Sequence, residues 1–496
     1  MLYKKPYLSN KTEYLTLFLI AFTVIFSSTY NPVNFRRMHV DSSIYVTIAR
    51  GITRGNLPYR DFIDNKGPLA YLISVPGLYL GGFTGIWITE IIFMFVSVLF
   101  VYKSALIFGD RFKALLGTIF SFVIMLAFFK VNAGTEEYSL PFLTISFYIF
   151  TKYFFSEKRE ACLTELIILG VCFSSSVLIR LNTFPLWAGF CTIIVADSLK
   201  KRRFAQLGKY VSGFCLGTII AFFPVFLYLY RNGIMDAFFE QAVIGGASKG
   251  FGSEGMKDIA KNYYAVIARN FSFFPLFFGL FRMITRFRQE EFAFYCGYTL
   301  SYFLSVLFLS FSSGDSHYNM ILIPFFIPAL IFLFDIMGSA FHGIRRKAVV
   351  IVLFAFLIFS EGLVKYFYDL AKVINDSSGV RLIKAGKMID DNTMADDKII
   401  SLGFNGYIYP FTQRDAASKY IYQGSGLDFL PGAREEFISD ILTKKPAVIA
   451  LFTAEDEAGQ IMPDWHAPIL EMMEKDYRLL SDDNGFRLFI RIENAA

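Results

Sequence analysis

The chain has 496 residues, of which 55% are hydrophobic and 18% charged, and its formal net charge is +6. A soluble domain carries about 25% charged residues and about 45–50% apolar ones, so this composition excludes an ordinary soluble protein. The apolar residues lie in long blocks, which predicts a polytopic α-helical membrane protein. The positive charge then belongs to loops, and we expect no nucleic-acid partner. The five cysteines form no C-x-x-C pair, so neither a disulfide framework nor a zinc site is indicated.

A transmembrane helix needs roughly 20 apolar residues, and on that basis the chain contains about eleven candidate spans. They lie near residues 13–31, 83–102, 113–130, 138–154, 163–179, 184–198, 210–230, 270–284, 291–311, 319–338 and 346–363. The first follows a basic start and has no small-residue cleavage site, so we expect a retained helix rather than a signal peptide.

The distribution of Lys and Arg predicts the orientation. With the N-terminus in the cytoplasm, every segment predicted inside is basic, including Lys158-Arg159, the run from Lys200 to Arg203, and Arg286 with Arg288. The short outer loops carry one such residue or none, which agrees with the positive-inside rule. An odd number of spans then places the C-terminal region outside the cytoplasm.

The composition changes near residue 372, where apolar runs shorten and acidic residues become frequent. The β-rich runs KIISLGF, PAVIALF and FRLFIRI alternate with helix-like stretches, a pattern typical of an α/β domain. We therefore expect a membrane domain over 1–371 and a small extracytoplasmic α/β domain over 372–496.

The first predicted outer loop, residues 32–82, holds a dense group of charges beside an apolar helix, which is rare without a use. Asp41 can cap a helix that runs to about Arg54, with isoleucines four residues apart giving it an apolar face on the membrane surface. The turn that follows carries the other candidates: Tyr59, Arg60, Asp61, Asp64 and Lys66. The simpler interpretations are a helix cap for Asp41 and a headgroup contact for Lys66.

Further polar candidates lie in the other outer loops. Glu136 and Glu137 begin a predicted helix, where acids also favour the helix dipole. His317 titrates near neutral pH and can donate to a phosphate, although a loop histidine can also be merely solvated. Arg180, between two spans, is a possible second cation.

The first loop resembles the GT-C glycosyltransferases. An Asp after the first span is followed by Gly-x-x-Pro-Tyr-Arg-Asp-x-x-Asp-x-Lys-x-Pro over residues 55–68. The branch it resembles contains the bacterial protein-mannosyltransferases and aminoarabinose transferases (glycosyltransferase family 39-like). The resemblance extends to Thr135-Glu136, to His317-Tyr318 and to the C-terminal outer domain. It implies a GT-C-like fold and a sugar donor carried on polyprenyl phosphate.

The resemblance also implies roles for single residues. Asp41 would activate the acceptor, Glu136 would be a second acid in the cavity, and Lys66 would contact the donor phosphate. The other residues expected to bind substrate are Tyr59, Arg60, Asp61, Asp64, Glu137, Arg180, His317 and Tyr318. Relatives often carry Asp-Glu after the first span, whereas Ser42 follows Asp41 here. A divalent metal is therefore possible but not indicated, and no other cofactor is expected.

These features predict a multi-pass plasma-membrane enzyme with its active site on the extracytoplasmic face. It would move a sugar from a polyprenyl-phosphate donor to a glycan, lipid or protein acceptor, with inversion and Asp41 as the base. The alternatives are a lipid-linked sugar flippase or transporter, and a non-catalytic membrane scaffold. Apart from Glu90, the charges collect at the predicted outer side, which favours an enzyme over a transporter.

Overall fold

The computed structural model describes residues 11–33, 40–128, 134–246, 256–268, 272–311, 315–340, 364, 366–368, 370–371, 378–403, 406–423, 427, 430–452, 464–483 and 486–492. Its internal contacts divide the chain into two compact units. Unit 1 comprises Met1–Ser28, Trp87–Leu227 and Gly250–Lys372, and unit 2 comprises Thr29–Ile86, Tyr228–Lys249 and Val373–Ala496.

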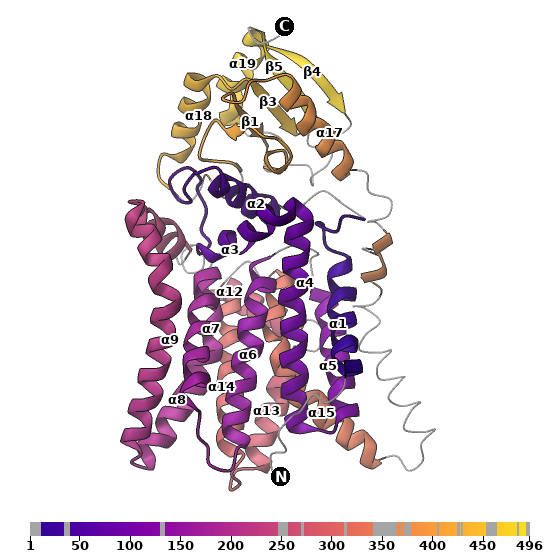
Figure 1. Ribbon diagram of the computed structural model, residues 1–496, viewed down its shortest axis with the longest axis vertical. Helices are drawn as coiled ribbons and strands as arrows, with labels where there is room; N and C mark the ends of the chain where they lie inside the picture. Colours follow the sequence, from indigo (N-terminus) through magenta and orange to yellow (C-terminus); the bar gives the residue numbers. More distant parts are fainter. Residues whose placement is uncertain are drawn as a thin grey trace. The chain divides into compact units, whose positions relative to one another are not determined.

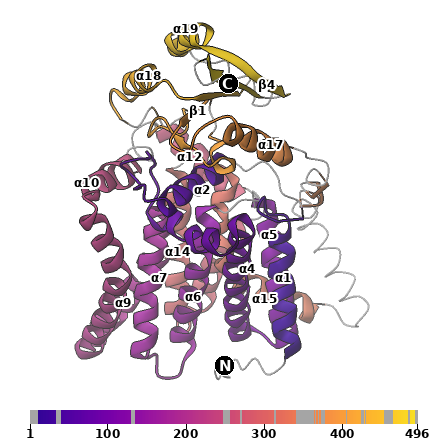
Figure 2. The same cartoon turned by 45° about the horizontal axis from the view of Figure 1, so that its top comes forward.

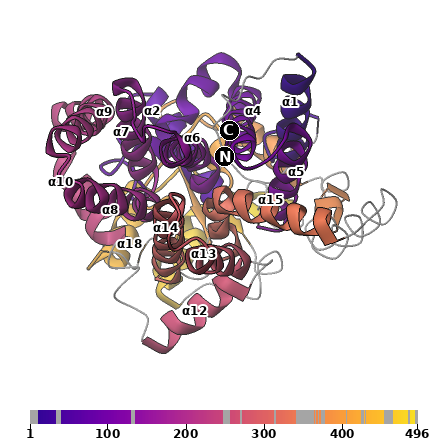
Figure 3. The ribbon, with the colours of Figure 1, turned by 90° about the horizontal axis from the view of Figure 1, so that it is seen from below.

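Unit 1 is a bundle of apolar helices that run side by side in Figure 1. Its elements are α1 (Lys11–Phe26), the later part of α4 (Ser74–Phe108), α5 (Arg111–Phe128), α6 (Thr135–Phe155), α7 (Leu163–Ile179), η1 (Leu181–Thr183), α8 (Pro185–Lys200), α9 (Phe204–Arg231), α12 (Met256–Ala268), α13 (Phe273–Thr285), α14 (Phe292–Ser310), η4 (Ser316–Leu322) and α15 (Ile323–Ala340). Figure 3 shows the same bundle end on, with α8, α14 and α13 as neighbours.

Aromatic rings and small residues hold these helices together. The rings of Phe150 and Phe190 stack with centroids 4.9 Å apart, which joins α6 to α8. Helix α8 approaches α14 closely because Gly189 has no side chain: a Cβ there would lie 2.2 Å from the hydroxyl of Ser301. Small residues of this kind are typical of helix contacts in membranes, where close backbone approach replaces hydrophobic driving force.

The predicted spans overlap these helices, except 346–363, which lies outside the described residues. Among the residues described, five helices are long and apolar enough to cross a membrane, or six if α12 and α13 count as one bent span. Helices α7 and α8 have only 17 and 16 residues. A membrane helical protein is thus confirmed, whereas the count of about eleven spans stays a prediction.

Unit 2 contains a five-stranded sheet in the order β2-β1-β3-β5-β4. The strands are β1 (Lys398–Leu402), β2 (Asp415–Ala416), β3 (Val448–Phe452), β4 (Tyr477–Asp483) and β5 (Phe486–Arg491). Strand β1 is parallel to β2 and β3, while β5 is antiparallel to β3 and β4. The three β-rich runs predicted from the sequence are β1, β3 and β5. Figure 2 shows helices α17 (Ser378–Asp391), α18 (Ala433–Lys444) and α19 (Ala467–Asp476) around the sheet.

Unit 2 also takes in parts of the two long predicted outer loops. They supply α2 (Val40–Thr53), α3 (Leu69–Leu72), α10 (Met235–Phe238) and the π-helix η2 (Phe239–Gly245). The N–H of Ile63 donates to the carbonyl of Lys419 at 3.0 Å, and Arg54 pairs with Asp415 at 3.1 Å. The compact units therefore cut the chain differently from the predicted division at residues 371/372, which stays a prediction about domains along the sequence.

Helix α2 differs from its sequence-based interpretation in two ways. It begins at Val40, so Asp41 stands in the first turn and not at the cap position. Residues 42–49 are all buried by protein, and α2 packs against α3 and against the short helix η5 (Tyr409–Phe411). The expectation of an amphipathic helix on the membrane surface was therefore wrong, because both faces of α2 are covered by the chain itself.

Candidate active site

The turn from Tyr59 to Lys66 is tied into a tight structure in unit 2. Tyr59 has φ of 66°, in the left-handed region that side chains rarely adopt. Its hydroxyl donates to the carbonyl of Lys66 at 2.7 Å, and its own carbonyl accepts from Gln241 at 2.7 Å. Strain of this kind persists only where surrounding contacts enforce it, and it is frequent at functional sites.

Asp64 is the buried carboxylate of this turn, with 4% of its surface exposed. Its Oδ2 accepts a hydrogen bond from the hydroxyl of Tyr71 at 2.7 Å. Burial raises the pKa of Asp64, the cation of Lys66 and the bond from Tyr71 oppose that rise, and the charge of Asp41 adds to it. Asp64 is therefore held in surroundings that favour its neutral form.

Asp41 and Lys66 lie close enough to Asp64 for their charges to affect it. Burial also raises the pKa of Tyr422, and the charges of Asp64 and then Asp41 raise it further. Two carboxylates, one ammonium group and a phenol thus share one region of unit 2. Asp41 is half-buried, which leaves part of its side chain accessible.

Asp61 and Arg60 have a different place in the same turn. Asp61 accepts from the N–H of Leu57 at 2.7 Å and receives two bonds from the guanidinium of Arg60 at 2.9 Å. Burial favours a higher pKa for Asp61, but the bonds from Arg60 and Leu57 outweigh it, and its pKa is lowered. Asp61 is therefore a charged residue that stabilises the turn, and both of its carboxylate oxygens already accept hydrogen bonds.

Unit 1 contains a second cluster, around Arg180. The guanidinium of Arg180 pairs with the carboxylate of Glu136, and these side chains are 11% and 5% exposed. It also lies over the ring of Tyr318, 4.0 Å from the centroid, and donates to Asn182 at 2.6 Å. Thr135 donates to the other carboxylate oxygen of Glu136 at 3.2 Å. Three loops far apart in sequence thus meet at one cation.

Glu137 and His317 complete this cluster. Glu137 accepts from the N–H of Gly134 at 2.8 Å and so closes the first turn of α6, as its position at the helix start predicts. It also lies within electrostatic range of Glu90, whose carboxylate accepts from Ser28 at 2.6 Å. The ring of His317 packs against Tyr318 with centroids 4.3 Å apart.

The structure thus gathers the eleven candidates into two clusters, one in each unit. The proposal that Asp41, Lys66, Glu136 and His317 line one cavity stays a prediction. Sequence reasoning missed two residues that bind Asp64. Tyr71, in an apolar stretch, donates to its carboxylate, and Gln241, in a distant predicted loop, accepts from its backbone N–H. No local pattern marks either residue. Among the described residues, no three His, Cys, Asp or Glu side chains are grouped as metal ligands.

Solved structures share this fold over nearly the whole chain. ArnT from Cupriavidus metallidurans bound to undecaprenyl phosphate superposes with a TM-score of 0.62 and 13% identity, covering 98% of this chain and 100% of that one. The oligosaccharyltransferase AglB from Archaeoglobus fulgidus, in complex with an inhibitory peptide and a dolichol-phosphate, has a TM-score of 0.54 and 12% identity, covering 96% of this chain and 74% of that one.

These similarities confirm the GT-C fold expected from the first loop, since both proteins are GT-C glycosyltransferases. A comparison with curated proteins found no match. The family described as "Putative competence-induced protein Ccs4 N-terminal domain" matches residues 6–373, about three quarters of the sequence. The chain belongs to this family.

Proposed function

We propose that this protein is a membrane glycosyltransferase that moves a sugar from a polyprenyl-phosphate donor to a glycan, lipid or protein acceptor. The observation that carries the proposal is the GT-C fold, shared over 98% of the chain with a protein bound to undecaprenyl phosphate. The charged turn from Tyr59 to Lys66 supports the proposal, because hydrogen bonds hold its residues together in unit 2. About eleven spans, a cytoplasmic N-terminus and an extracytoplasmic site and C-terminal domain belong to the same proposal.

The chemical problem is to displace a phosphate from the anomeric carbon while the acceptor hydroxyl loses its proton. A carboxylate near that hydroxyl can act as general base. Asp41 is our choice, because it is half-buried and forms the first turn of a helix held by protein on both faces. In-line attack by the acceptor would invert the anomeric centre.

The leaving phosphate needs cations that offset its charge as the bond breaks. Lys66 is the first of these, since its ammonium group contacts only the side chain of Asn65, at 3.2 Å, within the described residues. We propose Arg180 or His317 as a further donor. Glu136, our second choice of base, is engaged by Arg180, which suits it to hold that guanidinium in place.

The test is to incubate purified protein with polyprenyl-phosphate sugars and measure released polyprenyl phosphate. Removing a general base costs about 10²- to 10⁴-fold in rate, so Asp41→Asn should lose activity by that factor while remaining folded and membrane-inserted. Glu435→Gln is a matched control, because Glu435 is an exposed acid in the first turn of α18. Full activity of Asp41→Asn would exclude it as the base.

The same assay separates the alternative functions. A flippase would move the lipid-linked sugar across the bilayer without releasing polyprenyl phosphate. A scaffold would do neither. Release of polyprenyl phosphate that depends on an added acceptor supports the transferase alone.

A further inference from the structure

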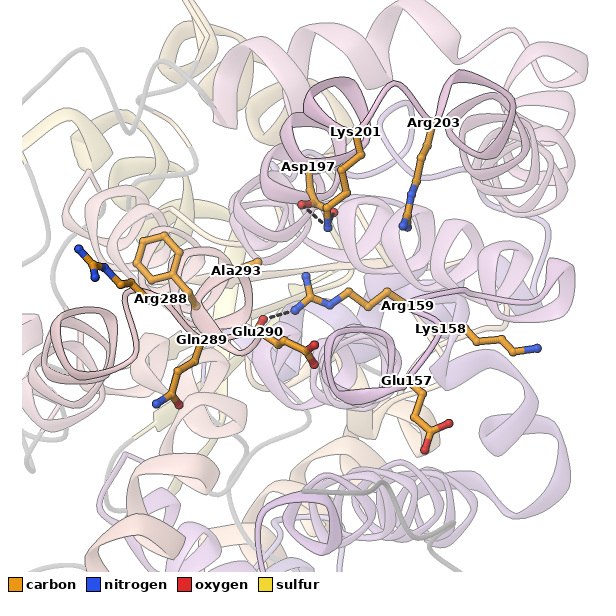
Figure 4. Close-up of a pocket in the computed structure, with 11 residues that line it drawn as sticks. Glu157, Lys158, Arg159, Asp197, Lys201, Arg203, Arg288, Gln289, Glu290 and Ala293 are labelled. Atoms are coloured by element: carbon orange, nitrogen blue, oxygen red, sulfur yellow. Dashed lines mark hydrogen bonds and ion pairs between the residues drawn. The ribbon is translucent and has the colours of Figure 1, made fainter.

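A charged pocket of about 460 Å³ opens at one end of the helices of unit 1 (Figure 4). Its walls are the α6–α7 connection, the end of α8 with the residues that follow it, and the α13–α14 connection. Three arginines and two lysines line it, against two glutamates and one aspartate. None of these residues belongs to either cluster of the candidate active site.

Three of the cations converge in Figure 4. Arg159 crosses the middle of the view and donates to the carbonyl of Glu290, while Lys201 extends to Asp197 and pairs with it at 2.8 Å. Arg203 extends toward the same space, and within the described part of the chain its guanidinium has no ion pair. A further anion would therefore meet Arg203 without displacing an existing carboxylate.

The backbone around Arg159 is held in place rather than loose. Arg159 has φ of 45°, in the left-handed region. Its carbonyl accepts hydrogen bonds from Tyr210 at 3.2 Å and Gln206 at 3.4 Å, both on α9. The side chain of Arg159 thus reaches the α13–α14 connection while its backbone is anchored to α9. This wall of the pocket is preorganised, which lowers the entropic cost of binding.

Guanidinium and ammonium groups together suit a phosphate, since a planar guanidinium donates two parallel bonds to phosphate oxygens. The three segments that line the pocket are among those predicted on the cytoplasmic side from their Lys and Arg content. The cytoplasmic leaflet is rich in anionic lipids, and basic pockets between helices on that side suit their headgroups.

We infer that this pocket is a phosphate-binding site at the cytoplasmic ends of α6, α8 and α14, separate from the site for the lipid-linked donor. Its ligand is the phosphate of an anionic membrane lipid or a soluble phosphate. The inference does not depend on the proposed transferase activity, because its test measures binding alone.

The experiment compares two double variants of the full chain. Lys201→Gln with Arg203→Gln removes two cations that line the pocket, whereas Lys200→Gln with Arg202→Gln removes two from the same turn that do not. A hydrogen bond from a charged group to a phosphate contributes at least about tenfold in affinity, so the pocket variant, which loses two such donors, should bind phosphatidylglycerol at least about tenfold more weakly. The control should change little.

Binding is measured by native mass spectrometry of micellar protein titrated with phosphatidylglycerol, phosphatidylcholine or inorganic phosphate, with thermal unfolding as the folding check. If the pocket variant alone loses binding of phosphatidylglycerol, the phosphate that the pocket binds comes from a membrane lipid. Pocket-dependent binding of inorganic phosphate without the lipid effect assigns the soluble source. Equal losses in both variants, or phosphatidylcholine bound as well as phosphatidylglycerol with no binding of phosphate, would overturn the inference.

Discussion

The buried pair of Glu136 and Arg180 allows the role of Glu136 to be measured. Breaking such a pair on one side costs about 3–5 kcal/mol, because the remaining charge stays buried without its counter-ion. With side chains only 5% and 11% exposed, Glu136→Gln should lower the free energy of unfolding by that amount. Arg180→Met should cost at least as much, since it also loses the contact with the ring of Tyr318.

The double variant Glu136→Gln/Arg180→Met leaves no unpaired charge at this position. Contacting residues couple by about 0.5–3 kcal/mol, and a buried pair belongs at the upper end. The double variant should therefore be about 3 kcal/mol less destabilised than the sum of the two single variants. The measurement is the free energy of unfolding of each variant, from denaturant titration in mixed micelles.

An exposed ion pair in the same unit provides the control. Lys113 and Asp335 have side chains 34% and 48% exposed, and such pairs contribute about 0–1 kcal/mol. The cycle of Lys113→Met and Asp335→Asn should show little coupling. If the losses of unfolding free energy in Glu136→Gln and Arg180→Met added up to the loss in the double variant within about 0.5 kcal/mol, the assignment of Glu136 as the counter-ion of Arg180 would be refuted.

Three further predictions concern unit 2. Because the pKa of Asp64 is raised, the folded protein keeps a proton that the unfolded chain releases near pH 4, so the free energy of unfolding should fall as the pH rises from about 4 through the raised pKa. Asp64→Asn should flatten that slope when unfolding is measured as a function of pH. An unchanged slope would contradict the burial argument. Lys66→Ala should weaken binding of the lipid-linked donor by about 10- to 100-fold in a titration, as loss of a charged hydrogen bond implies, and an unchanged affinity would exclude a phosphate contact. Asp415→Asn should cost at most about 1 kcal/mol in the unfolding titration, because the side chains of Asp415 and its partner Arg54 are 40% and 27% exposed. A loss of several kcal/mol would mean that unit 2 depends on this ion pair.

Local pattern was enough to predict much of this protein. Long apolar runs have to be helices, because lipid offers no partner for free backbone groups. The strands β1, β3 and β5 follow from β-rich runs, and Glu137 closes a helix turn three residues after Gly134. The motif over residues 55–68 also indicated the GT-C fold, which the solved structures confirm.

The environment of each candidate residue required the folded structure. Asp61 and Asp64 are three residues apart in one motif, yet Asp61 is charged by its bonds to Arg60 while Asp64 is buried against Tyr71. Burial and partner charges decide which of the two carboxyl pKa values is raised, and the burial depends on how the rest of the chain packs around the turn.

The first loop shows this division between sequence and fold most clearly. Its charges, its turn and its helix could be predicted from residues 32–82 alone. Sequence could not show that α2 is covered by protein, that Gln241 from a distant loop holds the carbonyl of Tyr59, or that the loop binds residues near Lys419. These contacts join segments about 180 to 360 residues apart, and only the free energy of packing the whole chain selects among such pairings.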